Sequence, residues 1–319
     1  MLLEINELTK VYRSGSRAND GISLSVAEGE VFGLLGHNGA GKTTLVNQVV
    51  GLLRPTAGSI RIDGRDMVAN PGLARRLCSF QAQAQVPIDG LTPRQAIDLL
   101  GQLRGASKAE VRMRRDRLVE ALELGEWMDV DAARLSGGVK RLVAFAMASV
   151  SPGRLVMLDE PTNDVDPVRR RLLWRQVRSL ADHGAAVLLV THNVIEAERS
   201  VDRLAILDEG RVIAEGTPAT LKARLGAELR LEVVLDPDAA ATLVSPFGQG
   251  VAVGNRLMIG VPSGSAGDAV AWADSKVRVG LIEEFTLGPA TLEDVYVALV
   301  GGSQREPLPV KEVLGATAA

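Results

Sequence analysis

The stretch GHNGAGKTT, residues 36–44, decides the fold of this chain. It matches the phosphate-binding pattern G-x-x-x-x-G-K-[ST] at every fixed position. The apolar segment EVFGLLG (30–36) precedes it, and the apolar segment TLVNQVVGLL (44–53) follows it. A strand, a glycine-rich turn and a helix in this order point backbone N–H groups and the positive end of a helix dipole at phosphate oxygens. We therefore expect a nucleotide phosphate site at this turn.

Two side chains of this turn have specific expected roles. The ammonium of Lys42 is expected at the β- and γ-phosphates, and the hydroxyl of Thr43 at a bound Mg²⁺. Most other contacts should come from backbone N–H groups that curl round the phosphate oxygens. The nucleotide-binding residues predicted in this turn are Gly36, His37, Asn38, Gly39, Ala40, Gly41, Lys42, Thr43 and Thr44.

Two acids end a second apolar strand, RLVMLDE (154–160). A phosphate-binding loop needs a metal carboxylate on a neighbouring strand, so Asp159 is predicted to hold Mg²⁺ directly or through water. Glu160 is predicted to be the general base that polarises the water attacking the γ-phosphate. A third strand, AAVLLVTH (185–192), ends in His192, which is expected to touch the γ-phosphate or to hold Glu160 and the water in place.

Three further features suit a nucleotide. Tyr12 in VYRSG suits stacking on an adenine ring, and the glutamines of SFQAQAQVP (79–87) suit contact with the metal or the water. The turn LSGG (135–138) precedes a helical run, VKRLVAFAMASV, and so has the features of a second anion site. One chain thus carries two phosphate-binding helix starts about a hundred residues apart.

Taken in chain order, these motifs resemble the ATP-binding subunit of an ABC (ATP-binding cassette) transporter. The match covers the P-loop, the glutamine loop, LSGG, LDE, the aspartate loop NDVDP (163–167) and the final Thr-His. It extends over about residues 1–225. The resemblance implies that ATP and Mg²⁺ are the cofactors and that the chain hydrolyses ATP.

The resemblance also implies roles for single residues. Tyr12 corresponds to the aromatic that stacks on adenine, and His192 to the switch histidine. Gln83 is the expected glutamine-loop residue, serving Mg²⁺ and catalysis, while Gln81 and Gln85 remain rivals for that role.

The same resemblance accounts for the second phosphate site. In this family two ATPase domains pair head to tail, and the P-loop of one and the LSGG turn of the other close on a single ATP. Ser136, Gly137 and Gly138 are therefore expected to contact the ATP of a second ATPase subunit, identical or different. ATP binding would hold the two domains together, and hydrolysis would let them separate.

The pattern of elements predicts an α/β protein with a P-loop NTPase core and a mostly parallel sheet over 1–225. Its helical subdomain is expected at about 86–152, where Thr92 and Pro93 have the features of a helix start. Four arginines of this subdomain are expected to form a solvated helix face: Arg112, Arg114, Arg115 and Arg117.

The C-terminal part has a different order of strands and helices. A βαββαβ order, with its first helix at about 238–244, predicts a small ferredoxin-like α+β domain over 226–302. Its final TLEDVYVALVGG (291–302) resembles the ends of ATPases from bacterial drug and antibiotic exporters. The remaining residues, 303–319, are expected to be a mobile tail.

The ABC motifs depart from the usual pattern at four positions. Val139 stands where a polar residue is usual, Leu142 and Met147 stand where arginines are usual, and Asp164 stands where glycine is common. Arg141 lies one place before the usual arginine. One explanation is drift that leaves the backbone contacts intact. The other is an asymmetric pair of ATPases in which this LSGG turn serves a weaker composite site.

Composition narrows the class of protein. The 319 residues are 46% hydrophobic and 24% charged, so a large core is expected. A net charge of −3 and only 3% aromatic residues argue against nucleic acid as a partner. The single cysteine, Cys78, has apolar neighbours and is expected to be a buried thiol in a reducing compartment.

Membrane association is expected only through a partner. The first residues, MLLEINELTK, have no apolar signal region. The longest apolar run, 142–148, is far shorter than the roughly 20 residues of a spanning helix. We therefore expect a separate transmembrane permease, received at about 83–105, and a place on the cytoplasmic face of the membrane.

These observations together predict an ATPase that powers an exporter of a drug, antibiotic or lipid-like substrate. Two alternatives are an ABC importer ATPase and a soluble ABC ATPase acting in translation or DNA repair. The latter usually carries two ATPase units or a long coiled-coil insert, and neither feature is visible in the sequence.

Overall fold

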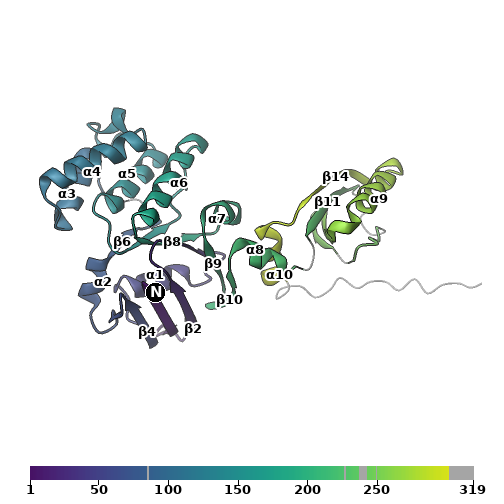
Figure 1. The fold of residues 1–319 in the computed structure, drawn as a ribbon, viewed down its shortest axis with the longest axis horizontal. Helices are drawn as coiled ribbons and strands as arrows, with labels where there is room; N and C mark the ends of the chain where they lie inside the picture. The colour runs from purple at the N-terminus through teal and green to yellow at the C-terminus, as the bar shows by residue number, and fades with distance from the viewer. Residues whose placement is uncertain (85, 226–227, 237–242, 249, 302–319) are drawn as a thin grey trace, which may run out of the picture. The chain divides into compact units, whose positions relative to one another are not determined.

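The computed structural model describes residues 1–301 with the exception of 85, 226–227, 237–242 and 249 (Figure 1). The chain divides into two compact units, and the boundary falls between Leu221 and Lys222. The predicted tail, 303–319, lies outside the described residues.

A six-stranded sheet forms the centre of the first unit, in the order β10-β9-β3-β8-β7-β6. All neighbours are parallel except β10, which pairs antiparallel with β9. Every residue of β3, β7 and β8 is buried, as expected for strands covered on both faces. The predicted mostly parallel sheet is therefore confirmed. Its strands are β3 (Val31–Leu35), β6 (Cys78–Gln81), β7 (Leu155–Asp159), β8 (Ala186–Thr191), β9 (Arg203–Asp208) and β10 (Arg211–Gly216).

The two faces of this sheet contribute to two separate cores. Leu155 and Met157 of β7 pack with α1 (Lys42–Val49), whereas Val156 and Leu158 pack with helices on the other face. Those helices include α5 (Gly137–Ser149) and α6 (Pro167–Asp182). Figure 1 accordingly shows α5 and α6 above the strands and α1 below them. The two phosphate-binding helix starts of the sequence therefore lie on opposite faces of one sheet.

A second, antiparallel sheet covers the α1 side, in the order β2-β1-β4-β5. The sequence patterns did not predict this separate antiparallel sheet. Its strands are β1 (Leu3–Val11), β2 (Arg17–Val26), β4 (Ala57–Ile62) and β5 (Arg65–Asp66). Three short helices were likewise not predicted: α2 (Pro71–Leu77), α7 (Val194–Ser200) and α8 (Pro218–Ala223).

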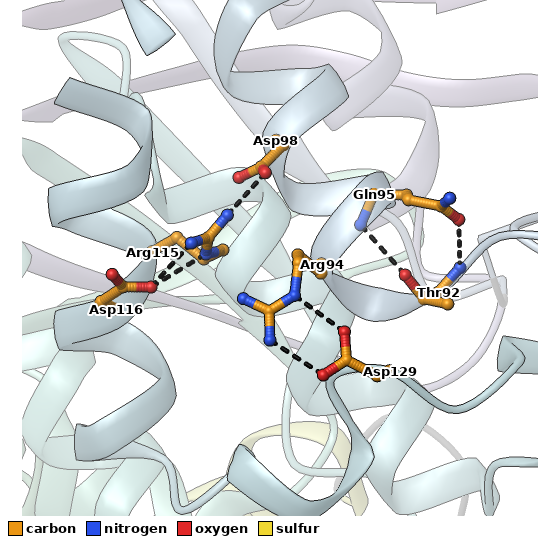
Figure 2. Close-up of polar contacts among 7 residues, drawn as sticks. All are labelled: Thr92, Arg94, Gln95, Asp98, Arg115, Asp116 and Asp129. Atoms are coloured by element: carbon orange, nitrogen blue, oxygen red, sulfur yellow. Dashed lines mark hydrogen bonds and ion pairs between the residues drawn. The ribbon is translucent and has the colours of Figure 1, made fainter. Parts of the chain in front are cut away.

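The helical part contains α3 (Pro93–Leu103), α4 (Lys108–Ala121), two 3₁₀ turns at Gly125–Trp127 and Ala132–Arg134, and α5. Thr92 caps α3 as predicted, with Pro93 at the first helical position. The Thr92 hydroxyl accepts the Gln95 N–H at 3.3 Å, and the Gln95 amide oxygen accepts the Thr92 N–H at 2.9 Å (Figure 2). This reciprocal pair is a capping box.

The expectation for Arg115 was wrong. Its side chain is 6% exposed, and its guanidinium contacts Asp98 of α3 at 2.5 Å and Asp116 at 2.8 Å (Figure 2). A charge buried to this degree needs a partner, and Asp98 supplies it from the neighbouring helix. Arg112 and Arg117 are exposed and Arg114 is half-buried, as a solvated face requires.

The second unit contains an antiparallel sheet in the order β12-β13-β11-β14, with α9 packed against it. This is the strand order of the predicted ferredoxin-like fold. The helix expected at about 238–244 lies largely outside the described residues. The elements are β11 (Leu229–Leu235), β12 (Val251–Val253), β13 (Arg256–Val261), α9 (Ala266–Arg278), β14 (Ile282–Pro289) and α10 (Leu292–Gly301).

Candidate functional site

The phosphate-binding turn connects β3 to α1, and its glycines are required by the local geometry. Gly41 precedes α1 with φ 103°, in the left-handed region that glycine adopts readily. A Cβ at Gly41 would lie 2.2 Å from the Ala18 carbonyl oxygen. A Cβ at Gly36 would lie 2.4 Å from the Leu207 carbonyl oxygen. Larger residues at either position would displace the turn from its neighbours.

The Lys42 side chain lies across this turn. Its ammonium donates to the carbonyl oxygens of Gly36 at 2.5 Å and His37 at 3.0 Å. Burial lowers the pKa of Lys42, and the Glu160 and Asp159 carboxylates oppose that shift. The turn thus contains a buried cation that faces the two acids predicted for the site.

Side chains of two other elements hold the turn in place. The fully buried Asn19 of β2 donates to the Gly41 carbonyl oxygen at 3.1 Å and accepts from Gln48 of α1 at 2.6 Å. The imidazole Nε2 of His37 lies 3.0 Å from Asp208 Oδ1 at the end of β9. Sequence reasoning missed the support from Asn19 and Asp208. Neither belongs to a motif, and each contact joins segments that are distant in the sequence.

Tyr12, predicted to stack on adenine, lies beside the start of α1. Its hydroxyl is 3.2 Å from the Thr44 hydroxyl, and the residue is 40% exposed. Thr43, the predicted metal ligand, is exposed. The structure therefore brings Tyr12, Thr43, Thr44 and Lys42 to one end of α1.

Asp159 is the last residue of β7 and Glu160 follows it, and both residues are buried. Burial and the neighbouring Glu160 raise the pKa of Asp159 to about 6, against the opposing charges of Lys42 and Arg141. Glu160 has φ 48°, which is uncommon for a residue with a side chain, and its N–H donates to the Val190 carbonyl oxygen at 2.9 Å. This backbone turn directs Glu160 to the end of β8.

The Glu160 carboxylate is held by donors from two consecutive residues. The Thr191 hydroxyl donates to Oε2 at 3.0 Å, and the His192 N–H donates to Oε1 at 2.7 Å. The His192 imidazole Nδ1 lies 2.6 Å from the same Oε1. Of the two contacts expected for His192, the structure contains the one with Glu160.

The three candidate glutamines have different surroundings. Gln81 ends β6 with a buried side chain, whose amide donates to the Arg141 carbonyl oxygen at 3.3 Å. Gln83 is exposed, and its own carbonyl oxygen accepts from the Arg141 guanidinium at 2.8 Å. Gln85 lies outside the described residues. Among the described two, only Gln83 has a side chain that is open to solvent.

The Ser-Gly-Gly turn begins α5 on the other face of the sheet. Ser136 caps this helix, and its hydroxyl accepts the Val139 N–H at 3.4 Å. A Cβ at Gly138 would lie 2.4 Å from the Asp164 carbonyl oxygen, so this turn packs tightly on the aspartate loop. Asp164 has φ 64°, which explains why glycine suits that position. The turn is not part of the cluster around Lys42.

Comparisons with known proteins agree with this geometry. A protein-family model described as "ABC transporter" matches residues 19–163. The daunorubicin/doxorubicin resistance ATP-binding protein of Streptomyces peucetius is 36% identical over 314 residues, covering 94% of this chain and 92% of the relative. The chain belongs to the ABC transporter family. It is an ATP-binding and ATP-hydrolysing subunit.

Other relatives of this ABC ATPase extend the similarity. The Nod factor export ATP-binding protein I of Mesorhizobium japonicum is 36% identical over 289 residues, covering 90% of this chain and 83% of the relative. A solved ATP-binding subunit of an ABC transporter superposes with a TM-score of 0.67 at 30% identity, covering 71% of this chain and 94% of that one. A bacterial ABC transporter cassette solved as a dimer gives a TM-score of 0.61 at 26% identity, covering 67% and 98%.

Three departures of this ABC ATPase from its family pattern have a common position in the fold. Val139, Leu142 and Met147 all belong to the core that α5 shares with the sheet. Their exposed fractions are 7%, 0% and 9%. Apolar side chains suit those positions because they are shielded from water.

Proposed function

We propose that this chain powers an exporter of drug-like, antibiotic or lipid-like molecules by hydrolysing ATP. The observation that carries this proposal is similarity over nearly the full chain, at 36% identity, to proteins named for daunorubicin resistance and Nod factor export. That similarity includes the C-terminal unit as well as the ATPase core. The core and the C-terminal domain are proposed to span about 1–225 and 226–302.

The residues around Lys42 suit the triphosphate of ATP. The backbone of 36–43 offers N–H groups, and Lys42 offers its ammonium to the β- and γ-phosphates. The exposed ring of Tyr12 suits the adenine. The remaining turn residues, His37, Asn38 and Thr44, line the same end of α1.

Oxygen ligands present here fit Mg²⁺. Thr43 offers a hydroxyl, Asp159 a carboxylate and Gln83 an amide oxygen, which are the donors this hard cation prefers. Within the described ranges, no three His, Cys, Asp or Glu side chains form a metal cage. A site with so few protein ligands suits an ion that takes its other ligands from phosphates and water. When bound, that ion would neutralise phosphate charge.

Glu160 is proposed to be the general base. It would accept a proton from the water as the water oxygen bonds to the γ-phosphorus and the bond to the β-phosphate oxygen breaks. The Thr191 hydroxyl and the His192 N–H donate to the carboxylate, and the His192 Nδ1 lies beside it, so little reorganisation is needed during the reaction. His192 would thereby orient the base and sense the γ-phosphate beside it.

A second ATPase subunit is proposed to complete the site. Ser136, Gly137 and Gly138 start a helix on the face of the sheet opposite α1, which suits contact with the partner's ATP rather than with this chain's own. Their hydroxyl and N–H groups would bind its γ-phosphate in a head-to-tail dimer, formed with an identical or a different subunit. Val139, which replaces the usual polar residue, donates its N–H to the Ser136 hydroxyl at 3.4 Å, so the helix is capped with valine at this position.

A transmembrane permease is proposed as the other partner. No helix in the described ranges combines the length and apolar character needed to cross a bilayer. The segment proposed to receive the permease, about 83–105, includes Leu99 and Leu103 of α3, which are 52% and 73% exposed. The ATPase would then lie at the cytoplasmic face of the membrane.

Mixed dimers test the composite site. One copy carries Lys42→Ala, so that only one ATP site remains, built from the intact copy's P-loop and the other copy's Ser136 turn. Ser136→Ala should lower turnover when it is placed in the Lys42→Ala copy, by about tenfold, and much less when placed in the intact copy. Equal effects in the two placements would contradict the head-to-tail arrangement.

Transport assays test the export role. Cells that express the chain with its membrane partner should retain less daunorubicin than cells in which the chain carries Lys42→Ala. A substrate that accumulates faster in the cells with the intact chain would indicate import instead.

A further inference from the structure

One side chain joins the glutamine loop to the helix that begins at Ser136. Arg141 lies in the second turn of α5, and the residue is 8% exposed. Its guanidinium donates to the carbonyl oxygens of Ala82 at 3.0 Å and Gln83 at 2.8 Å. Its own carbonyl oxygen accepts from the Gln81 side chain at 3.3 Å. The last residue of β6 and the first two residues of the loop after it are therefore bonded to one residue of α5.

The geometry of this contact suits arginine. A guanidinium is planar and presents a fork of N–H donors, which can reach two consecutive carbonyl oxygens at once. A lysine ammonium has the same charge but carries its donors on a single nitrogen, whereas Arg141 reaches the two oxygens through two different nitrogens. The next residue, Leu142, is fully buried in the core, so the usual place of the arginine is not available for this contact.

We propose that Arg141 is a positioning residue that makes the glutamine loop and the Ser-Gly-Gly turn move as one body. The inference rests on the proposed function, because it needs composite ATP sites. Gln83 serves the ATP bound by its own chain, whereas Ser136 serves the ATP bound by the partner. Arg141 thus connects the two ATP sites of the dimer through a single chain.

The geometry gives this connection a direction. The Ser136 turn is continuous with α5, and Arg141 is five residues along the same helix. If Gln83 moved without the helix, both bonds would break and leave the guanidinium of Arg141, which is 8% exposed, without these two acceptors. Leaving a buried charged donor without a partner is costly. The helix therefore follows the loop, and turnover at one site depends on the state of the other.

Single-site dimers test this proposal. Full-length copies are paired so that one carries Lys42→Ala and supplies only its Ser136 turn, while the other supplies the P-loop. Arg141→Met is placed in either copy, and kcat and KM for ATP are measured. We expect kcat to fall about tenfold or more in both placements, with KM changed less than about threefold, because misplacement of catalytic groups mainly affects the reaction step.

Two comparisons separate positioning from a loss of folding. Arg141→Lys keeps the charge and length of the side chain but not the fork, so it should keep its thermal unfolding temperature and still lower kcat. Arg112→Met removes an exposed arginine of α4 and should leave kcat unchanged. Combining Arg141→Met with Ser136→Ala in the Lys42→Ala copy should cost no more than either change alone, since both act through one turn.

The outcomes distinguish this inference from the proposed function. If Ser136→Ala in the Lys42→Ala copy leaves kcat unchanged, the composite site itself is wrong. If Ser136→Ala lowers kcat but Arg141→Met in that same copy does not, the composite site stands and the link through Arg141 is overturned. Full activity of Arg141→Lys would also overturn it, because a charge alone would then suffice.

Discussion

The imidazole Nδ1 of His192 lies 2.6 Å from the Oε1 atom of Glu160, across 32 positions of sequence. The carboxylate is buried, whereas the histidine side chain is 52% exposed. The Glu160 carboxylate is therefore held inside the protein, whereas the His192 imidazole is accessible to a ligand that binds at the end of the sheet. That arrangement suits a base whose orientation depends on the γ-phosphate.

Glu160→Gln should stop the chemical step without preventing ATP binding. The glutamine has nearly the same shape but cannot accept a proton from water, so kcat should fall by at least roughly 10². ATP should then remain bound, and a dimer that persists in ATP should be visible by size-exclusion chromatography. Glu120→Gln, an exposed change on α4, is the matched control. Unchanged hydrolysis in Glu160→Gln would remove Glu160 as the base.

Asp159→Asn should stabilise the nucleotide-free protein at neutral pH. The pKa of Asp159 is raised from 3.8 to about 6 in the folded chain, so the folded state keeps a proton that the unfolded state has already lost. The stability that this carboxyl group contributes is therefore lost as the pH rises from about 4 to about 6, and it stays lost above about pH 6. The resulting decrease in the free energy of unfolding is at most about 3 kcal/mol.

Denaturant unfolding without Mg²⁺ from pH 4 to pH 8 measures this effect. Asp159→Asn should exceed the parent in stability at pH 8, and the gap should close towards pH 4. Asp129→Asn provides a comparison of opposite sign, because a hydrogen bond from Arg94 lowers the pKa of Asp129 (Figure 2). A gap for Asp159→Asn that widens on acidification would show that the pKa of Asp159 is lowered instead.

Gly138→Ala should disturb the Ser136 turn and the aspartate loop together. The added Cβ would lie 2.4 Å from the Asp164 carbonyl oxygen, and contacts under 3.0 Å require the backbone to shift. We expect ATP hydrolysis by the dimer to fall about tenfold or more, while ATP binding by the separate chain changes little. Gly125→Ala, where a Cβ meets nothing within 4 Å, is the control. Equal activity of the two variants would show that the two loops move independently.

Local signals in the sequence were sufficient for the parts of the fold that depend on neighbouring residues. The phosphate-binding turn, the cap at Thr92 and the buried strands before Asp159 and His192 all follow from short patterns of apolar, glycine and capping residues. The four strands of the second unit and the helix between its last two strands were readable for the same reason. These features are encoded by spacing within about ten residues.

Contacts between distant segments could not be read in this way. Asn19 lies in β2 of the antiparallel sheet and donates a hydrogen bond to the Gly41 carbonyl oxygen. The residues next to Asn19 in the sequence do not distinguish it from any other polar residue of a strand. Arg115 lies in a sequence run of arginines that are otherwise exposed or half-buried, and the ion pair with Asp98 of the neighbouring helix α3 accounts for its burial. The sequence shows that Arg141 lies one position before the usual arginine. Its hydrogen bonds to the Ala82 and Gln83 carbonyl oxygens depend on how α5 packs against the glutamine loop, which the sequence does not reveal.

Thr92→Ala should destabilise the helical part while leaving the chemistry intact. Loss of the hydroxyl leaves the Gln95 N–H without its acceptor at the start of α3, which typically costs about 1 kcal/mol. Thr92→Ser keeps the acceptor and should retain most of the stability. Hydrogen exchange should show faster opening of α3 in Thr92→Ala. The kcat for ATP of the isolated subunit should stay within about twofold of the parent, because in the described part of the chain Thr92 forms its hydrogen bonds with Gln95 and Ala96, which belong to α3. Equal protection of α3 in the alanine and serine variants would show that Pro93 and packing alone fix the start of this helix.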